Sequence, residues 1–365
     1  MNRGRRVGGS PRATWFVTRK HPPRIGGMET LSWELTTRIG RRRPVWLLAL
    51  RRGSAWLPIF MVRCALAILG NRRRIEVLHL GDAVLAPLGL LARLLGIPVC
   101  VTVHGLDLTY DSAAYRIWLR LFFRGLGAYI CTSETVCGAA IGRGAPALLT
   151  RVVGIGAVPC HDGKELRQPE LLLFVGRLVR RKGLAWFVRE VLPELAARRP
   201  NVRLAVIGAG PELPVVQREA SVAGVAKRIE WLGALPDSEK CRWLQRAAVC
   251  VLPNVRVEGD IEGYGIVALE AAAAGCAVVA ADIEGLRDAL DHGQGGTLLP
   301  SADAAVWTAT LDALLRDPEA AAALGRRART WVEQERSWDE VCDRYEAIFD
   351  GLVVGVLPPE ASARC

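Results

Sequence analysis

Short apolar runs alternate with segments of helical periodicity along most of the chain. The runs are rich in leucine and β-branched residues and read TWFVT, VWLLAL, IEVLHL, PVCVTVHG and AYICTS, followed by ELLLFVG, VRLAVIG, IEWLG, VCVLP, CAVVA and GTLLP. Such runs favour buried strands, and helical segments between them favour parallel sheets covered by helices. The pattern predicts an α/β protein.

The alternation stops at residues 156–170, where GAVPCHDGKELRQPE is rich in proline, glycine and charge. Such a composition is typical of a linker between domains. We therefore expect two doubly wound α/β domains, which the length of 365 residues also favours over a single core. The last helical stretch, WDEVCDRYEAIFDGLV, has a periodicity that fits either domain.

The composition is that of a globular protein. It is 51% hydrophobic and 23% charged, which excludes a disordered or fibrous chain. None of the ten cysteines forms a Cys-x-x-Cys pair, and several lie in apolar runs: Cys100, Cys131, Cys250 and Cys276. We expect reduced cysteines and a cytoplasmic protein.

The N-terminus is basic and lacks an apolar stretch of signal-peptide length. The longest apolar segment, AWLPIFMVRCALAILG, is interrupted by Pro58 and Arg63 and is too short to cross a bilayer. We therefore expect neither export nor a membrane-spanning helix.

Charge is divided unevenly between the two predicted halves. Residues 1–170 contain 25 basic and 10 acidic residues, a net charge of +15, whereas the remainder has a net charge of −4. Such asymmetry favours an anionic partner for the first half, although a solvated basic surface remains an alternative. Nucleic acid is disfavoured as a partner, because no aromatic residues interleave with the basic ones.

Two motifs in the first half follow predicted strands. Gly26 and Gly27 open a helix after the first strand, where free N–H groups favour an anion, although an ordinary glycine turn is the alternative. VHGLD follows the fourth strand and carries His104 and Asp107. A lone histidine at such a place is either catalytic or structural.

In the second half, FVGRLVRRKG places Arg177 and Lys182 between a strand and a helix. Two cations there suit a diphosphate, and a solvated basic loop is the alternative. VIGAGPE follows the next strand and matches part of a dinucleotide fingerprint, but Leu213 stands where the third glycine is expected.

In the stretch VEGDIEGYGIVALEAAAAG, the carboxylates of Glu262 and Glu270 lie on either side of a predicted helix start. Gly263 and Gly265 allow close approach of an anion to the first N–H groups of that helix. Glu270 is suited to accept hydrogen bonds from a ribose diol, and Glu262 from a sugar. Alternatively, acidic residues near a helix start can simply stabilise that helix. This alternative explains Glu262, but it does not explain Glu270.

With these motifs in order, the chain resembles the retaining nucleotide-sugar glycosyltransferases of the GT-B fold, in the mannosyltransferase and sucrose-synthase-like group (glycosyltransferase family 4). The resemblance covers nearly the whole chain and rests on GGME, HGLD, TSE, GRLVRRKG, GAGPE, LGALPDSE, EGYGIVALEAAAAGCAVVA, GGTLLP and SWDEVCDRYEAIF. It implies two facing Rossmann-like domains with the active-site cleft between them. The acceptor-side domain would comprise residues 1–160 and about 337–365, and the donor-binding domain residues 170–336.

The resemblance also implies roles for the motif residues. Glu262 would face the sugar hydroxyls and Glu270 the ribose, while Arg177 and Lys182 would hold the donor diphosphate. His104 would lie beside the anomeric carbon and completes, with Arg177, Lys182 and Glu262, the expected catalytic set. The other expected donor-binding positions are Gly26, Gly27, Gly263, Tyr264, Gly265, Ile266 and Val267. VVGIGAVP departs from the family pattern, with Ile155 where an asparagine is common.

The chemistry expected from the resemblance needs neither a metal nor a cofactor besides the donor, because the sequence has no Asp-x-Asp pair. The leaving phosphate would help to deprotonate the acceptor, so no side-chain nucleophile is named. We expect transfer of a hexosyl group to a hydroxyl of a glycan or lipid-linked acceptor, in the synthesis of a cell-surface polysaccharide or glycolipid.

The stretch AWLPIFMVRCALAILGNRRR combines apolar residues with flanking arginines, as an interfacial helix does. We expect peripheral contact with an anionic membrane at its cytoplasmic face, with a helix that only packs on the sheet as the alternative. Two other classes of function stay open. One is an NAD-dependent oxidoreductase built on VIGAGPE and Glu230, and the other is a non-catalytic sugar- or lipid-binding protein.

Overall fold

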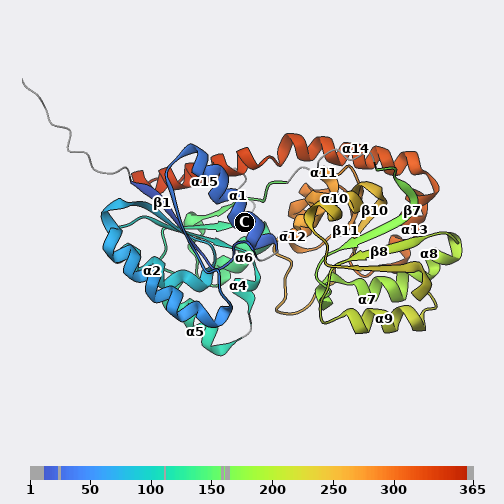
Figure 1. Ribbon diagram of the computed structural model, residues 1–365, viewed down its shortest axis with the longest axis horizontal. Coiled ribbons are helices and arrows are strands. Elements are labelled where there is room, and N and C mark those ends of the chain that lie inside the picture. The colour runs from blue at the N-terminus through green and yellow to red at the C-terminus, as the bar shows by residue number, and fades with distance from the viewer. Residues whose placement is uncertain (1–11, 24–25, 111, 158–159, 161–164, 360–365) are drawn as a thin grey trace, which may run out of the picture. The chain divides into compact units, whose positions relative to one another are not determined.

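The computed structural model describes residues 12–23, 26–110, 112–157, 160 and 165–359. The chain divides into two compact units. The first comprises Met1–Thr132, Val136–Val153 and Cys342–Cys365, and the second Ser133–Thr135 and Gly154–Val341. Each unit is built on one six-stranded sheet, so the α/β fold predicted from the sequence is confirmed (Figure 1).

The sheet of the first unit has the strand order β2-β1-β3-β4-β5-β6, and all its pairs are parallel. Its strands are β1 (Ala13–Thr18), β2 (Val45–Ala49), β3 (Ile75–Leu80), β4 (Val99–Val103), β5 (Ala128–Cys131) and β6 (Thr150–Val152). The reversal of strand order beside β1 is that of a doubly wound sheet, in which polar residues at the carboxyl ends of the strands form binding sites.

Helices cover both faces of this sheet. They are α1 (Gly27–Arg42), α2 (Leu57–Asn71), α3 (Ala86–Leu94), α4 (Leu106–Thr109), α5 (Ala113–Phe122), α6 (Glu134–Gly142) and α15 (Trp338–Val354). One core cluster joins α2, α3, α5 and α6 to the sheet through side chains such as Ile68, Leu88 and Leu119. Figure 1 shows α1 and α15 on the opposite face of the sheet from α2 and α5.

The sheet of the second unit has the order β12-β11-β10-β7-β8-β9 and is also parallel. Its strands are β7 (Gln168–Val175), β8 (Arg203–Ile207), β9 (Ile229–Gly233), β10 (Ala247–Leu252), β11 (Ala277–Ala281) and β12 (Thr297–Leu299). Its helices are α7 (Leu184–Trp186), α8 (Leu192–Arg198), α9 (Leu213–Val222), α10 (Asp237–Arg246), α11 (Ile266–Ala273), α12 (Glu284–Ala289), α13 (Ala304–Arg316) and α14 (Pro318–Glu335).

All eleven apolar runs singled out in the sequence contain or overlap a strand. The sequence analysis missed β6, because three residues at the edge of a sheet are too short to give a periodic signal. Of the predicted linker, residues 158–159 and 161–164 lie outside the described residues.

Helix α15 packs on the first sheet, although it ends the chain. Tyr345 contacts Thr102 of β4 through a 3.0 Å hydrogen bond, and Thr102 in turn contacts His79 of β3 at 2.8 Å. The ring of Phe349 meets Phe16 of β1 edge to face. These buried contacts between distant segments assign the helix to this sheet, which the helical periodicity alone did not.

The prediction of reduced cysteines was wrong for one pair. Cys160 and Cys241 form a disulfide, with a Cα–Cα distance of 5.7 Å that lies in the usual range. The two residues lie 81 positions apart and outside the long apolar runs, so sequence spacing gave no sign of the pairing. The other seven described cysteines are buried thiols.

The apolar segment at residues 55–70 is helical and longer than the sequence suggested. The continuous helical run Ser54–Arg74 has 21 residues and a mean hydropathy of 1.4, enough by length and composition to cross a membrane. Only 11% of its apolar window is buried within the fold. The expectation of a segment too short to cross a bilayer was wrong on length, because helical turns at Ser54–Trp56 and Arg72–Arg74 extend α2 at both ends.

Candidate functional site

A buried ion cluster lies at the carboxyl ends of β7 and β10 in the second unit. Glu262, in the loop between β10 and α11, is 8% exposed. Its Oε2 contacts the guanidinium of Arg181 and the amine of Lys182, and it accepts a 2.8 Å hydrogen bond from Asn254 Nδ2. Its backbone N–H donates to Glu284 Oε2 at 2.6 Å. The loop is therefore anchored by two neighbouring segments, those of Arg181–Lys182 and Glu284, and by Asn254 at its own beginning.

Burial and the contacts within the cluster shift the pKa values of its side chains. Burial alone would raise the pKa of Glu262, but the positive charges of Lys182 and Arg181 and two hydrogen bonds outweigh it and lower the pKa to about 2. Burial lowers the pKa of Lys182, aided by the charges of Arg181 and Arg177, while Glu262 opposes the shift. Glu262 is therefore an ionised hydrogen-bond acceptor at neutral pH and not a proton donor.

Arg181 is a buried member of this cluster that sequence reasoning missed. It is 5% exposed and binds Asp260 at 3.0 Å as well as Glu262. Arg177 is exposed, and its charge acts on Lys182. The turn after Lys182 is left-handed and tightly packed: Gly183 has a φ of 68°, and a Cβ there would lie 1.8 Å from the Pro253 carbonyl oxygen.

The start of α11 lies directly after the Glu262 loop. Its N-cap is Gly265, with a left-handed φ of 85° and no side chain to occupy the first N–H groups, those of Ile266 and Val267. A Cβ on Gly265 would lie 2.5 Å from Leu286. The sequence predicted an anion at the N-terminus of α11, and among the described residues no side chain caps this helix start.

Glu270 lies on α11 and has partners of its own. Its Oε1 accepts a 2.8 Å hydrogen bond from Lys240 of α10, and Lys240 also contacts Asp237 at 2.9 Å. The structure therefore does not join Glu262 and Glu270 through a shared partner. Lys240 had no signal in the sequence, because no motif there includes it.

Gly263 and Tyr264 complete the loop. A Cβ on Gly285 would lie 2.5 Å from the carbonyl oxygen of Gly263, so the two loops pack backbone to backbone. The hydroxyl of Tyr264 lies 3.5 Å from the Ile155 carbonyl oxygen, so the segment that departs from the family pattern contacts the tyrosine side chain.

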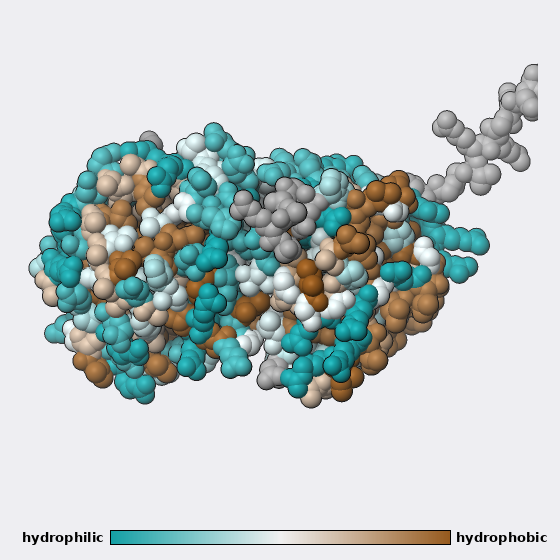
Figure 2. All heavy atoms as spheres, turned by 180° about the vertical axis from the view of Figure 1, so that it is seen from behind, coloured by the Kyte–Doolittle hydropathy of each residue, from teal (hydrophilic) through white to brown (hydrophobic). Residues whose placement is uncertain are grey.

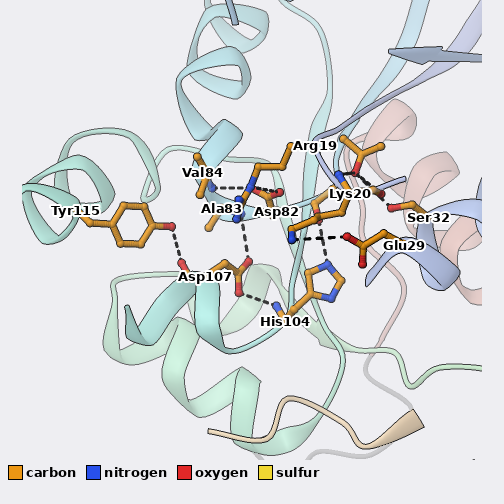
Figure 3. Close-up of polar contacts among 12 residues, drawn as sticks. Arg19, Lys20, Glu29, Ser32, Asp82, Ala83, Val84, His104, Asp107 and Tyr115 are labelled. Carbon is orange, nitrogen blue, oxygen red and sulfur yellow. Dashed lines mark hydrogen bonds and ion pairs between the residues drawn. The ribbon is translucent and has the colours of Figure 1, made fainter. Parts of the chain in front are cut away.

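A second polar cluster lies in the first unit, at the ends of β3 and β4 (Figure 3). His104 Nε2 lies 3.0 Å from the Gly81 carbonyl oxygen, which can only accept, so Nε2 is the donor of this hydrogen bond. The carboxylate of Asp107 accepts hydrogen bonds from the backbone N–H groups of His104 at 2.9 Å and Ala83 at 3.2 Å. Asp107 therefore holds the two strand-end loops together around His104.

Next to it, Arg19 binds the fully buried Asp82 at 2.7 Å. Burial raises the pKa of Asp82, although Arg19 opposes the shift. Gly26 and Gly27 begin α1 in the same unit. A Cβ on Gly26 would lie 2.6 Å from Glu29 Oε2, and Lys20 contacts Glu29 at 3.6 Å (Figure 3). A carboxylate of the chain itself thus lies where the sequence predicted a bound anion.

The glycines of VIGAGPE have a packing explanation. Gly208 has a φ of 138°, and a Cβ there would lie 1.9 Å from the Gly176 carbonyl oxygen, while one on Gly210 would lie 2.3 Å from that of Leu178. The β8 loop therefore packs against the β7 loop with no room for side chains. This close packing accounts for the glycine pattern without a dinucleotide.

Comparisons with known proteins agree with this organisation. Residues 13–156 match the family described as "Glycosyl transferase 4-like domain", and residues 169–317 match "Glycosyl transferases group 1". The GDP-mannose-dependent alpha-(1-6)-phosphatidylinositol monomannoside mannosyltransferase of Mycolicibacterium smegmatis is 38% identical over 170 residues, which span 46% of this chain and 44% of that protein. The glycogen synthase of Mycobacterium tuberculosis (strain H37Rv) is 29% identical over 318 residues, 82% of this chain and 75% of that protein.

Solved structures show the same fold. The Anabaena protein HepE, determined with UDP and glucose, superposes with a TM-score of 0.71 at 15% identity, over 92% of this chain and 98% of its own. Sucrose-phosphate synthase from Thermosynechococcus elongatus gives a TM-score of 0.74 at 18% identity, over 94% of this chain and 100% of its own. These likenesses define a GT-B fold of two Rossmann-like units. The chain belongs to the glycosyltransferases of family 4 type, the "group 1" and "4-like" glycosyl transferases.

Proposed function

We propose that this glycosyltransferase moves a hexosyl group from a nucleoside-diphosphate sugar to a hydroxyl of a glycan or lipid-linked acceptor, with retention of configuration and without a metal. One observation carries the proposal: a buried carboxylate held by two cations lies directly before a helix whose N-terminus is free to bind an anion. A nucleotide sugar presents the matching groups, which are sugar hydroxyls beside a diphosphate.

The contacts of Glu262 support its assigned role. All its carboxylate contacts with the described residues are made by Oε2, so Oε1 remains to accept a hydrogen bond from a sugar hydroxyl. Lys182, the exposed Arg177 and the first N–H groups of α11 would hold the diphosphate. Glu270 would exchange part of its contact with Lys240 for the ribose hydroxyls.

In the proposed reaction, the bond between the anomeric carbon and the diphosphate oxygen breaks as a bond forms to the acceptor oxygen on the same face. The leaving phosphate takes the acceptor proton, and the cations around it stabilise the growing charge. His104 keeps the role that the family resemblance implies, beside the anomeric carbon, and its Nε2 is held by the Gly81 carbonyl oxygen. No side chain is assigned as a nucleophile.

The relatives narrow the substrates to be tested. The mycolicibacterial relative is named for GDP-mannose and a phosphatidylinositol mannoside, and HepE was determined with UDP and glucose. We therefore propose a mannosyl or glucosyl donor and a lipid-linked acceptor used on the cytoplasmic side of a membrane, in the synthesis of a surface glycolipid or polysaccharide.

The test is donor turnover with GDP-mannose and UDP-glucose, with a chelator or with magnesium, followed by NMR of the anomeric proton of the product. We expect release of one nucleoside diphosphate at a rate that the chelator leaves unchanged, and a product with the donor's configuration. Glu262→Gln should lose at least about a hundredfold in rate, because its hydrogen bonds act at the reacting sugar. An inverted product, or turnover that requires a metal, would refute the mechanism.

A further inference from the structure

The outer side of a helix layer in the first unit is apolar. Helices α2, α3 and α5 cover the same face of the sheet, and their outward side chains include large hydrophobic residues that are 45–78% exposed: Ile59, Val62, Leu66, Leu69, Leu94, Ile117 and Leu121. We call these residues the outer helix face. Figure 2 shows hydrophobic residues gathered along the outer edge of this unit. Soluble proteins seldom expose so many large apolar side chains together without a binding partner.

Helix α2 is apolar on two sides. Its inner side places Cys64 and Ile68 in the core of the unit, with 2% and 0% exposure, while Val62 and Leu66 point outward with 59% and 63% exposure. The continuous helical run Ser54–Arg74 that contains α2 is long enough to cross a bilayer, but a crossing helix would have to leave this core. Since one side is already occupied by the sheet, α2 is suited to lie in a membrane surface and not to cross it.

The beginning of α2 has an interfacial aromatic residue. Trp56 precedes the helix, is 42% exposed and carries the guanidinium of Arg52 at 4.5 Å from its ring centre. A tryptophan stacked with an arginine suits the boundary between lipid headgroups and acyl chains. This end of α2 therefore has the composition of a membrane anchor point.

An arginine pocket lies at the α5 end of the same layer. It has a volume of about 380 Å³ and is lined by Arg116, Arg120, Arg124 and Arg143, together with Ile117 of the outer helix face. No described carboxylate lines it. A Cβ on Gly144 would lie 2.3 Å from Arg124 Nε, so the glycine leaves room for that side chain. Several guanidinium groups around one pocket suit a phosphate.

The chain segment around the outer helix face and the arginine pocket adds positive charge and almost no negative charge. Between residues 51 and 124 the chain has ten arginines and four acidic residues. Glu76 pairs with Arg43, and Asp82 and Asp107 are buried, while Asp111 lies outside the described residues. The combination of exposed apolar side chains and arginines matches the acyl and phosphate layers of an anionic phospholipid surface.

We propose that the outer helix face docks the first unit on an anionic phospholipid bilayer, with apolar side chains of α2 and α5 in the lipid and a lipid phosphate in the arginine pocket. The purpose of this docking rests on the proposed function, because it would bring the enzyme to a lipid-linked acceptor. The docking itself does not depend on the donor.

The experiment is flotation of the full chain with vesicles of phosphatidylcholine alone or with one third phosphatidylglycerol. One test variant is Val62→Asp with Leu66→Asp, and the other is Arg120→Glu with Arg124→Glu. Matched controls on the second unit are Val222→Asp, at a site that is 80% exposed, and Arg218→Glu, whose side chain is 69% exposed. We expect the wild type to bind the anionic vesicles. This binding should fall about tenfold or more in both test variants and should be unchanged in the controls.

The proposal would be overturned if the wild type bound neutral and anionic vesicles equally. It would also be overturned if either test variant bound like the wild type, or if the controls lost as much binding as the test variants. A further arm distinguishes lipid from free phosphate: if millimolar inorganic phosphate raises the thermal midpoint through the arginine pocket while vesicles are not bound, the bilayer is wrong as the ligand. Nucleoside-diphosphate binding, measured on the same variants, serves as the check of folding. If vesicles bind but no donor does, the proposed function fails and the docking stands.

Discussion

Glu262 shows how a single residue combines structure and chemistry. Its carboxylate is buried between two cations, so it stays charged where a neutral acid would otherwise be favoured. Its Oε2 makes all the carboxylate contacts with the described residues and anchors the loop, whereas Oε1 is the oxygen that would bind the sugar in the proposed function. The contribution of Glu262 to stability can be measured separately through its dependence on pH.

Acid should reveal the contribution of Glu262 to stability. Its pKa in the folded state, about 2, lies below the ordinary value of 4.5, so the stabilisation is complete above about pH 4.5 and is lost as the pH falls toward 2. We expect Glu262→Gln to lower the free energy of unfolding by roughly 3 kcal/mol at neutral pH and by progressively less in acid. Denaturant titrations across that window measure this difference, and a difference independent of pH would contradict it.

Arg181 and Arg177 should separate stability from binding. Arg181→Ala leaves Glu262 and Asp260 short of a buried partner, so we expect it to lower the free energy of unfolding by about 3 kcal/mol. Arg177→Ala removes an exposed charge and should leave stability unchanged while weakening nucleoside-diphosphate binding about tenfold. Urea denaturation and calorimetric titration of both variants give the two quantities. If the two substitutions had equal effects on the free energy of unfolding and on nucleoside-diphosphate affinity, the roles of Arg181 and Arg177 would be misassigned.

The sequence predicted the cluster in part. Lys182, Glu262 and the helix start were predicted because each follows a strand, and the carboxyl ends of parallel strands meet at one edge. The burial of Arg181 was not predictable, because its partners Asp260 and Glu262 lie about 80 residues away in the chain.

At the scale of elements, the runs that became strands were predictable because strands of covered parallel sheets are apolar throughout. The placement of α15 on the first sheet and the disulfide between Cys160 and helix α10 were not, since both join segments far apart in the chain. Helix α10 also carries Lys240, the partner of Glu270, so the disulfide ties the region before β7 to a helix of the second unit.

The disulfide should stabilise the second unit. A link across 81 residues restricts the unfolded chain, and we expect it to add about 4 kcal/mol to the free energy of unfolding. Unfolding by guanidinium with and without a reductant measures the difference, and Cys241→Ser should behave like the reduced wild type in both conditions. Equal midpoints for the oxidised and reduced protein would contradict a bond between these cysteines.

At the scale of the whole molecule, the chain divides its properties between two units. The first carries most of the positive charge and the exposed apolar helices, and the second carries the buried ion cluster and the free helix start. The proposed function assigns the membrane-bound acceptor to the first unit and the nucleotide sugar to the second. The charge asymmetry was visible in the sequence, whereas the exposure of α2 required the fold, because the same apolar pattern also suits a buried helix.

The most direct test of the central claim, a donor site in the second unit, is thermal unfolding with a panel of nucleoside diphosphates and nucleotide sugars, in the presence of a chelator and with NAD as a control. A ligand that binds only the native state must raise the midpoint temperature of thermal unfolding. We predict that GDP or UDP stabilises the wild type and the exposed-site control Lys227→Ala, and fails to stabilise Lys182→Ala and Glu270→Ala. Stabilisation by NAD alone, or by no nucleotide at millimolar concentration, would contradict the donor site.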